Sequence, residues 1–474
     1  MHSQAMFFKA RAGEKAADRA LQDKLGKAKS RFVAARAGAV ADYAGDFEAL
    51  REAGREIRDR ALASLDVWLE TFEERAGARG ARVMYARDGA EISRLVVDIA
   101  RRHGVTKVAK SKSMLSEEAG LNAALTAAGI EPVETDLGEY ILQIDGNEAP
   151  SHIIAPAFHK SKEEVAALFS RVHGKPLKDD ISAMTLEARA VLREHFLSAG
   201  MGMTGGNFLI AETGSVALVT NEGNGRMVTT LPKVHVVVTG IEKVIPTLED
   251  FATLMRLLPR SATGQSISNY VSVLTGVKDA AELDGPEHLY FILVDNGRVS
   301  LVGSEFEAML RCIRCGACMN HCPVYQTVGG HAYGWVYPGP MGSVLTPLYT
   351  GIARALDLPH ASTLCNQCGV VCPVKIPLPE LLRGLREKQV DLKLRPWRER
   401  LGLRAWGWLA QRPTLYGWAV RLGVRYLNWL ADGSDRIRVP GPAPGWTLGR
   451  DLPAPQGRTF RELYAARNKR EAKS

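Results

Sequence analysis

Residues 311–325 read RCIRCGACMNHCPVY and place Cys312, Cys315, Cys318 and Cys322 at C-x2-C-x2-C-x3-C-P spacing. Spacers of two residues let one tight backbone turn present three soft thiolates to one cubane iron-sulfur cluster. In two-cluster proteins with this spacing, the fourth cysteine ligates the other cluster. The stretch therefore predicts a second cysteine group elsewhere in the chain.

That second group is present as Cys365-x2-Cys368-x3-Cys372-Pro373. Crosswise ligation assigns a first 4Fe-4S cluster to Cys312, Cys315, Cys318 and Cys372, and a second to Cys322, Cys365 and Cys368. Ser362 stands where the full spacing would place one more cysteine. Three forms stay open for the second site: a four-iron cube with Ser362 or another non-cysteine ligand, which we favour, a cube with one open iron, or a 3Fe-4S cluster.

All seven cysteines lie between Cys312 and Cys372. An odd number of cysteines confined to one segment argues against a disulfide framework and for metal ligation in a reducing compartment. Zinc also binds C-x2-C pairs, but seven cysteines in crossed order fit zinc poorly. We expect His321 to form a hydrogen bond or to pack. Each cluster passes one electron, so the segment predicts an electron relay, with Lewis-acid binding of a hydroxy acid at an open iron as the alternative.

Upstream of the cysteines, apolar β-branched runs alternate with helical stretches. The runs are ARVMYA, VTKVAKS, SHIIAPAF, VHVVVTG and HLYFILVD. This alternation predicts an α/β domain with a largely parallel sheet. Ser161 and Glu164 predict a capping box, and Gly174 is placed to end that helix. The predicted domains are a helical N-terminal region (1–75), the α/β domain (76–303), an α-helical ferredoxin-type 4Fe-4S domain (304–390) and a helical, basic Trp/Arg-rich C-terminal region (391–474).

Three segments of the α/β domain are weak candidates for ligand binding. They are residues 110–122, with lysines before a serine-rich helix start typical of an anion site, residues 201–218 with Glu212, and residues 221–232 with Arg226. None has a strict GxGxxG or P-loop pattern, so ordinary turns are favoured for any single residue. We expect His152, His159 and His235, on or beside strands, to be core or surface histidines. No catalytic residue is assigned.

The C-terminal part of the chain is basic. The 474 residues carry a formal charge of +9, and residues 373–474 hold 21 Lys/Arg against 9 Asp/Glu. Among the arginines lie Trp397, Trp406, Trp408, Trp418 and Trp429. This composition predicts short helices that dock on a partner, or equally helices packed on their own domain. No export signal or spanning segment is evident, so we expect a cytoplasmic protein, with peripheral contact at the inner membrane face left open and no nucleic-acid binding.

Several motifs together resemble the lactate utilization protein B family, the LUD-domain iron-sulfur proteins of a three-protein bacterial L-lactate oxidation system. They are SKSMLSEEAGLN, ETDLGEYILQI, AETGSVALVTNEGNGR, LPKVHVVV, RCIRCGACMNHCPVY, GGHAYGWVYPGPMG and LCNQCGVVCPVKIPLPELL. The resemblance implies an α/β LUD domain of the sugar-isomerase/CoA-transferase type. It also implies two 4Fe-4S clusters with the same seven-cysteine division, and Ser362 at a position where family members likewise lack a cysteine.

The resemblance further implies an oxidoreductase subunit, the electron-transfer component of a complex that oxidises L-lactate to pyruvate. Its implied partners are a cysteine-rich subunit and a second LUD protein. Two alternatives stay open: a self-sufficient 2-hydroxy-acid dehydrogenase with substrate bound in the LUD domain, and a redox-sensing binding protein. The sequence identifies neither the lactate-contacting residues nor the electron acceptor.

Overall fold

A computed structural model describes residues 3–437 and 451–472, and the chain divides into two compact units, residues 1–389 and 390–474. Residues 438–450 and 473–474 of the predicted C-terminal region lie outside the described residues, as do residues 1–2 of the predicted N-terminal region. The helices of the first unit are α1 (Phe8–Ala16), α2 (Arg19–Ala41), α3 (Phe47–Ala63), α4 (Leu65–Ala78), α5 (Gly89–Arg102), α6 (Met114–Ala119), α7 (Leu121–Ala127), α8 (Leu137–Ile144), α9 (Lys162–His173), α10 (Ile181–Ser198), α11 (Asn224–Thr230), α12 (Leu248–Ala262), α13 (Ala317–Asn320), α14 (Pro323–Val328), α15 (Gly339–Thr350), α16 (Gln367–Val370) and α17 (Leu378–Asp391), which ends in the second unit.

The strands of the first unit are β1 (Arg82–Ala86), β2 (Lys107–Lys110), β3 (Glu131–Glu134), β4 (Met201–Thr204), β5 (Phe208–Ile210), β6 (Ser215–Thr220), β7 (Val234–Gly240), β8 (Val244–Ile245), β9 (Tyr270–Leu274) and β10 (His288–Val294). Six of them form one sheet in the order β1-β10-β7-β4-β2-β3, and every pairing in it is parallel. The predicted parallel sheet is confirmed. Four of the five predicted runs lie in it, because their continuous apolar residues suit strands buried on both faces.

The fifth run, SHIIAPAF, is not a strand, so that prediction is wrong. The backbone N–H and the hydroxyl of Ser151 both donate hydrogen bonds to the carbonyl of Pro156. His152 Nδ1 accepts hydrogen bonds from the backbone N–H groups of Ile154 and Ala155. These local bonds use backbone groups that a strand would pair with a neighbouring strand. His152 and His159 therefore lie in the connection between α8 and α9 rather than on or beside strands.

A second sheet, which the sequence did not predict, has the order β8-β5-β6-β9 and mixed pairing. It shares a core with α4 and one face of the large sheet, through residues such as Phe72, Leu209, Val216 and Phe291. The other face of the large sheet packs on α5, α6 and α7. The large sheet is thus covered on both faces, as parallel sheets require.

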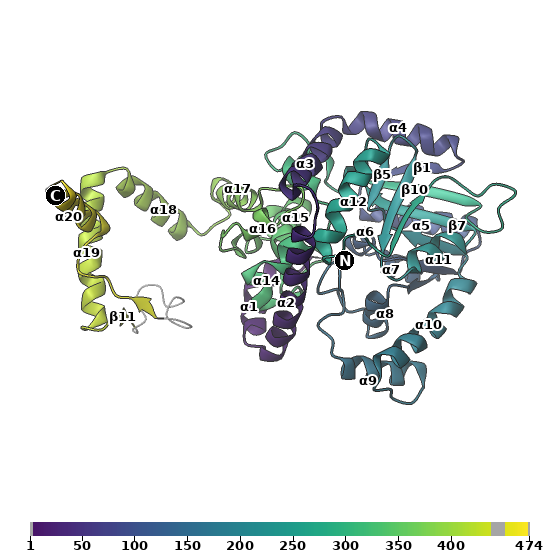
Figure 1. The fold of residues 1–474 in the computed structure, drawn as a ribbon, viewed down its shortest axis with the longest axis horizontal. Coiled ribbons are helices and arrows are strands. Elements are labelled where there is room, and N and C mark those ends of the chain that lie inside the picture. The colour runs from purple at the N-terminus through teal and green to yellow at the C-terminus, as the bar shows by residue number, and fades with distance from the viewer. Residues whose placement is uncertain (1–2, 438–450, 473–474) are drawn as a thin grey trace. The chain divides into compact units, whose positions relative to one another are not determined.

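The N-terminal helices pack on the cysteine-containing segment. Figure 1 shows α2 and α3 in purple beside the green helices α14, α15 and α16. One core cluster combines Leu25 and Leu50 of these helices, Phe208 and Leu257 of the α/β part, and many residues between 301 and 385. The helical N-terminal region therefore contributes side chains to the core of the first unit.

The predicted capping box is confirmed, because the Ser161 hydroxyl accepts from the Glu164 backbone N–H, the Glu164 carboxylate accepts from the Ser161 backbone N–H, and Gly174 ends α9 at a φ of +64°. The second unit contains α18 (Trp397–Ala410), α19 (Pro413–Ala431), β11 (Arg436–Ile437), β12 (Leu452–Pro453) and α20 (Phe460–Glu471). In the described part of the chain, no helix is both long and apolar enough to cross a bilayer.

Candidate functional site

The first cysteine group (Cys312, Cys315, Cys318, Cys322) and the second (Cys365, Cys368, Cys372) have similar local backbone features. Arg314 and Gly316 have positive φ angles of 59° and 75°, and Leu364 and Asn366, fifty residues later in each case, have 55° and 63°. Gly316 and Asn366 each directly precede a one-turn helix, α13 or α16. In this repeat Ser362 occupies the position of Cys312.

Ser362 is held by local hydrogen bonds. Its hydroxyl oxygen accepts from the Leu364 backbone N–H at 3.1 Å, and its carbonyl accepts from Arg386 at 2.9 Å. The side chain thus stays within its own turn. These contacts leave open the three forms of the second cluster site.

Four thiols line one small apolar cavity, and we name them the first thiol set: Cys312, Cys315, Cys318 and Cys372. The cavity has about 20 Å³ and is otherwise lined by residues such as Ile313, Met341, Val374 and Ile376. Burial raises the pKa of Cys372 to about 11, and burial with the neighbouring Cys372 and Cys312 raises that of Cys315. The last cysteine of the second group thus lies with the first three of the first group.

The remaining cysteines, named the second thiol set, are Cys322, Cys365 and Cys368. Burial and the neighbouring Cys322 raise the pKa of Cys368 to about 12. Burial also raises the pKa of Cys322, with Cys365 as its charged neighbour. Cys365 is exposed, and hydrogen bonds, first from the Gln367 backbone N–H, lower its pKa.

The donor chemistry of both sets fits iron-sulfur clusters. All seven cysteines are free of disulfides. Soft thiolates in apolar surroundings are the ligands that these clusters take, and metal binding deprotonates a thiol whose pKa burial alone raises. The first set offers four thiolates and the second three.

Arginines of α2 and α3 hold both cysteine groups in place. Arg51 donates to the carbonyls of Cys372 at 2.9 Å and Gly369 at 3.2 Å, and Arg36 donates to Val371. Arg58 is fully buried and donates to the carbonyls of Leu310 at 3.1 Å and of Val244 at 3.0 Å. Burial lowers the pKa of Arg58 to about 10. The N-terminal helices therefore position the backbone that carries the thiols.

A larger cavity, here called the sheet-end pocket, has a volume of about 320 Å³ and lies at the carboxyl ends of β2, β3, β4, β7 and β10. Ligands of parallel α/β sheets bind at this edge. All three candidate segments line the pocket, through Lys112, Gly205, Gly206, Asn207, Asn221 and Glu222 among others. The structure thus brings together segments that were weak candidates separately.

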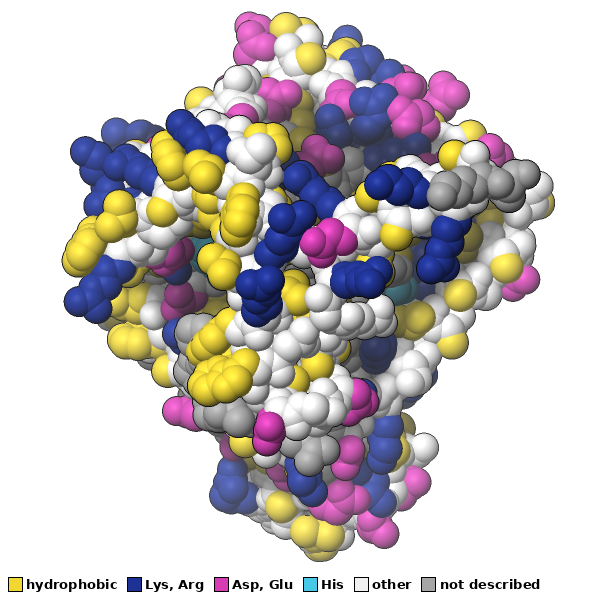
Figure 2. Space-filling model, turned by 90° about the vertical axis from the view of Figure 1, so that its left-hand side faces the viewer, with side chains coloured by type: hydrophobic (Ala, Val, Ile, Leu, Met, Phe, Trp, Pro, Cys, Tyr) yellow, Lys and Arg dark blue, Asp and Glu magenta, His cyan; other side chains and the backbone are white. Residues whose placement is uncertain are grey.

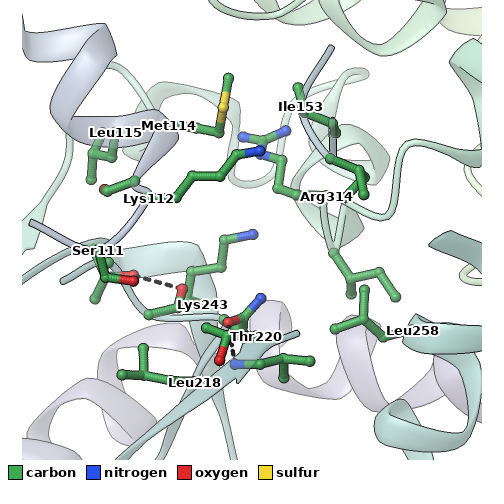
Figure 3. A pocket seen from close by; sticks show the side chains of 18 of the residues that line it. Ser111, Lys112, Met114, Leu115, Ile153, Leu218, Thr220, Lys243, Leu258 and Arg314 are labelled. Carbon is green, nitrogen blue, oxygen red and sulfur yellow. Dashed lines mark hydrogen bonds between the residues drawn. The ribbon is translucent and has the colours of Figure 1, made fainter. Parts of the chain in front are cut away.

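Part of the pocket wall comes from the cysteine segment, through Ile313, Arg314 and Tyr337. Lys243, which ends the short 3₁₀ helix Ile241–Lys243 after β7, donates from Nζ to the Cys312 carbonyl at 3.0 Å. Figure 3 shows Lys112, Lys243 and Arg314 pointing into the same space. The sheet-end pocket therefore adjoins the first thiol set.

Acidic groups also line this pocket. Glu242 is paired with Arg298 at 2.8 Å, and Arg298 is paired in turn with Glu118 at 3.1 Å. Glu222 accepts from the Leu137 backbone N–H at 2.9 Å. Burial and the neighbouring Asp136 raise the pKa of Glu222 to about 7. The negative charge of Glu242 is thus balanced by Arg298, whereas the pKa of Glu222 lies near neutrality.

Some predicted residues lie away from the pocket. Lys110 is buried in an ion pair with Glu134. Glu212 accepts from the Leu248 backbone N–H at 2.9 Å, and Arg226 lies over the Tyr270 ring. These three residues have structural contacts outside the lining of the sheet-end pocket.

Sequence reasoning missed Lys243, Arg314 and Asp136 as pocket residues. A usable signal existed for two of them, because Asp136 follows β3 and Lys243 follows β7 within three residues. Residues just after parallel strands meet at one edge of the sheet. Arg314 gave no such signal, since it lies between two cysteines.

The histidines form structural hydrogen bonds. His152 and His235 are buried, bonded to Asn320 at 3.0 Å and Thr204 at 2.9 Å, and burial lowers their pKa values to about 4 and about 3. They are core histidines, as expected. The predicted hydrogen bond of His321 is present, from Nδ1 to the Ala317 carbonyl at 2.9 Å.

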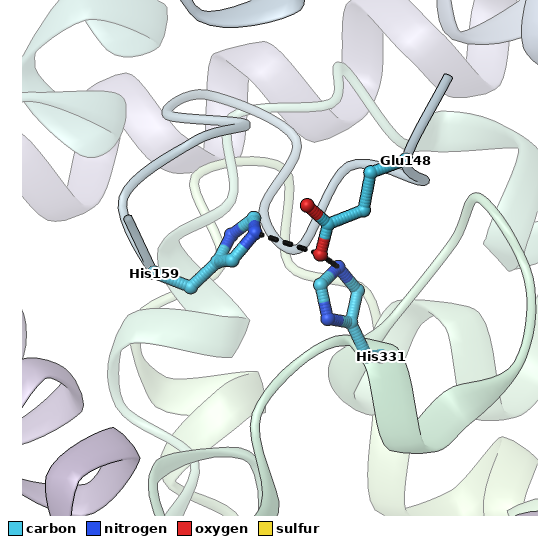
Figure 4. Close-up of side chains that lie close together, drawn as sticks. All are labelled: Glu148, His159 and His331. Atoms are coloured by element: carbon cyan, nitrogen blue, oxygen red, sulfur yellow. Dashed lines mark hydrogen bonds and ion pairs between the residues drawn. The ribbon is translucent and has the colours of Figure 1, made fainter. Parts of the chain in front are cut away.

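His159 lies with Glu148 and His331, as Figure 4 shows. His159 Nε2 is 3.1 Å and His331 Nε2 is 3.9 Å from the Glu148 carboxylate. Lys160 pairs with the same carboxylate, and His331 donates to the Ala149 carbonyl at 2.8 Å. The cluster therefore links the connection before α9 to the loop between the cysteine groups.

Three family profiles match consecutive parts of the chain. One described as LUD domain matches residues 69–294, one described as 4Fe-4S dicluster domain matches residues 308–376, and one described as Lactate utilisation protein B, C-terminal, matches residues 386–469. The chain is thus an α/β LUD domain followed by a ferredoxin-type 4Fe-4S domain and this C-terminal region.

Curated relatives match over nearly the whole chain. Lactate utilization protein B of Bacillus licheniformis is 42% identical over 463 residues, covering 98% of this chain and 97% of the relative. The protein of the same name from Bacillus pumilus is 44% identical over 468 residues, 98% of each chain, and that of Bacillus subtilis is 44% identical over 433 residues, 91% and 90%.

Among solved structures, a DUF162 family protein from Deinococcus radiodurans matches 49% of this chain and 98% of its own, at 16% identity and a TM-score of 0.28. That score carries no argument about the fold. The full-length identity to the curated relatives, together with the LUD and dicluster domains, decides the family. The chain belongs to the lactate utilization protein B family.

Proposed function

We propose that the protein is the iron-sulfur electron-transfer component of a system that oxidises L-lactate to pyruvate. The observation that carries the proposal is the pairing of two interlocked thiol sets with a full-length match to lactate utilization protein B. The relatives are named for lactate utilisation. Iron-sulfur clusters supply one-electron transfer when bound, and two of them accommodate a two-electron oxidation.

The proposed ligands are the two thiol sets. Cys312, Cys315, Cys318 and Cys372 would hold a first 4Fe-4S cluster, and Cys322, Cys365 and Cys368 a second, four-iron cluster with a ligand other than cysteine. The apolar cavity and the mutual effects of the thiols on their pKa values support this division. A three-iron second cluster is the alternative.

The surroundings of the two thiol sets support a direction of electron transfer through the protein. The first set adjoins the sheet-end pocket through Arg314 and the Lys243–Cys312 hydrogen bond. The second set reaches the surface at Cys365, Asn366 and Gln367. We infer that electrons enter near the first set and leave through the second, where a partner has access.

The described part of the second unit supports docking on a partner subunit. α18 has no buried residue, and α19 buries only Ala431. The exposed fractions of Trp397, Trp406, Trp408, Trp418 and Trp429 are 54–72%. Figure 2 shows a face of the molecule where hydrophobic side chains lie among Lys and Arg side chains. Exposed aromatic and arginine side chains are typical of protein interfaces.

We infer that the partners are a cysteine-rich subunit and a second LUD protein. Removal of α18 to α20 is expected to abolish co-purification with these subunits. A different result would favour a membrane-binding role for these helices: the full chain sediments with anionic vesicles at low salt but does not co-purify with the partner subunits.

The decisive assay offers L-lactate to the cluster-loaded chain, alone and with the two partner subunits, under anaerobic conditions. We expect reduction of the clusters, followed by absorbance and EPR, only when the partners are present. Reduction and pyruvate formation by the chain alone would replace the relay by a self-sufficient dehydrogenase. An absence of reduction in both mixtures would count against the role in lactate oxidation.

A further inference from the structure

Three cationic side chains meet in the sheet-end pocket. Lys112 follows β2, Lys243 follows β7, and Arg314 comes from the first cysteine group. Figure 3 shows all three side chains directed into the pocket from different elements. Like charges in one cavity repel each other, so an arrangement of this kind is favourable when an anion lies between them.

Local carboxylates compensate these cations only in part. Lys112 Nζ is buried and has no hydrogen-bond partner among the described residues. Its ion-pair partner Glu139 is 3.9 Å away, and burial raises the pKa of Glu139 to about 8, so this acid is mostly neutral at pH 7. Lys112 is therefore a buried donor directed into a cavity and in need of an acceptor.

Glu242 is the carboxylate nearest to the other two cations. It lies 3.9 Å from both Lys243 and Arg314, but it is engaged at 2.8 Å by Arg298. Arg314 donates to Met341 Sδ at 3.2 Å and lies over the Tyr337 ring. Both cations thus keep donor capacity for a further acceptor.

The remaining lining sets the class of the anion. Hydroxyl groups come from Ser111, Ser113 and Thr220, and an apolar patch comes from Met114, Ile153 and Leu258. A volume of about 320 Å³ is at the lower end for ligand pockets. A small organic acid with one polar substituent and a short apolar end fits this combination.

We propose that the sheet-end pocket binds a small 2-hydroxy or 2-oxo carboxylate, with its carboxylate between Lys112, Lys243 and Arg314. The charge pattern requires a small organic anion, and the choice of a 2-hydroxy acid rests on the proposed function. The anion then lies in the cavity whose wall carries Arg314, next to the first thiol set. The position of Ser362 in the second cluster site is not needed for this binding.

A competing explanation is that the cations only balance the negative charge of the first cluster. Lys243 and Arg314 fit it, since they border Cys312. Lys112 separates the two explanations, because it comes from the sheet edge and the charged groups that face it are Glu139 and Glu222 rather than a cysteine. A test on Lys112 therefore addresses ligand binding more than cluster charge.

The test is anaerobic calorimetric titration of the cluster-loaded full chain with L-lactate, pyruvate, propionate and the neutral lactamide. We expect L-lactate and pyruvate to bind, propionate to bind more weakly and lactamide not to bind. Lys112→Met should raise the dissociation constant at least about tenfold, as expected for a lost charged hydrogen bond. Lys112→Arg should restore part of the affinity, and the surface variant Lys278→Met should match the wild type.

Three results would overturn the proposal. The first is no binding by loaded wild-type protein, and the second is unchanged affinity in Lys112→Met. The third is equal affinity for propionate and L-lactate, which would reduce the pocket to a general small-anion site. Binding of pyruvate reduces no cluster, so the pyruvate titration keeps its meaning if the relay function fails. The relay assay likewise keeps its meaning if the pocket binds no anion.

Discussion

The first cysteine group lies in the interior of the molecule, whereas the second reaches its surface. No residue from 311 to 320 is exposed, while Cys365, Asn366 and Gln367 are. Both groups have positive φ angles at two equivalent positions. This difference in surroundings supports the proposal that the two sites have different tasks, one beside a pocket and one at the surface.

Removal of one thiol from each set should have the largest effect. Cys312→Ser takes a ligand from the first set, and Cys365→Ser takes one from the second, which has only three. Each variant should lose one cluster and thus about half of the bound iron. Iron and sulfide analysis with EPR of the reduced protein measures this. Loss of both clusters in either variant would mean that the sites are not independent.

The arginines of α3 should differ in the stability that they provide. Arg58 binds carbonyls next to the first group and is 1% exposed, whereas Arg51 binds those of the second group and is 9% exposed. Arg58→Met should lower the free energy of unfolding by about 2–4 kcal/mol and Arg51→Met by about 1–2 kcal/mol, because buried carbonyls lose charged donors.

Anaerobic guanidinium unfolding compares these two variants. Arg55→Met is the matched control, since Arg55 lies on the same helix in partly exposed ion pairs with Glu52 and Asp59. It should change stability by less than about 1 kcal/mol. An effect of Arg55→Met as large as that of Arg58→Met would contradict the anchoring role.

The Ser362→Cys variant should make the two sites more alike. It adds the thiol that the second set lacks, at the position equivalent to Cys312. We expect unchanged iron for a four-iron site, an altered EPR signal of the second cluster and slower loss of iron in air. Ser300→Cys, on an exposed turn, is the control. A gain of iron would instead indicate that the wild-type site holds a three-iron cluster.

The smallest expected effect concerns pH. Glu222 faces Asp136 and Lys112, and burial with Asp136 raises its pKa to about 7. Above that pH its negative charge repels a bound carboxylate, so affinity for L-lactate should fall about three- to tenfold between pH 6 and pH 8. Glu222→Gln should therefore weaken the dependence in titrations, and an unchanged slope would exclude Glu222.

The sequence predicted the parts of this molecule that depend on short-range spacing. Cysteine spacing indicated which thiols meet, and apolar runs such as VHVVVTG indicated buried parallel strands. The ligand assignment itself stays a prediction. The prediction of a strand at SHIIAPAF was wrong. Its apolar composition is typical of a strand, but Ser151 and His152 form hydrogen bonds with the backbone of residues two to five positions later.

The pocket could be predicted only in part, because the strand ends indicate one edge of the sheet but Arg314 reaches that edge only through the fold. Lys112 and Arg314 are separated by about two hundred residues and meet because the cysteine segment packs at the carboxyl end of the sheet. No local sequence pattern at Lys112 or Arg314 predicts that the two side chains lie close together. The short strands β5 and β8 were missed for a similar reason, since two or three residues carry no clear periodicity.

One measurement tests the interlocked, unequal pair of sites most directly: EPR of reduced Cys372→Ser. Cys372 belongs to the second group in sequence but lies with Cys312, Cys315 and Cys318 in the structure. We expect the first cluster's signal, identified by its loss in Cys312→Ser, to disappear or change while the second cluster's signal remains. Loss of only the signal that Cys365→Ser removes would contradict the crossed arrangement.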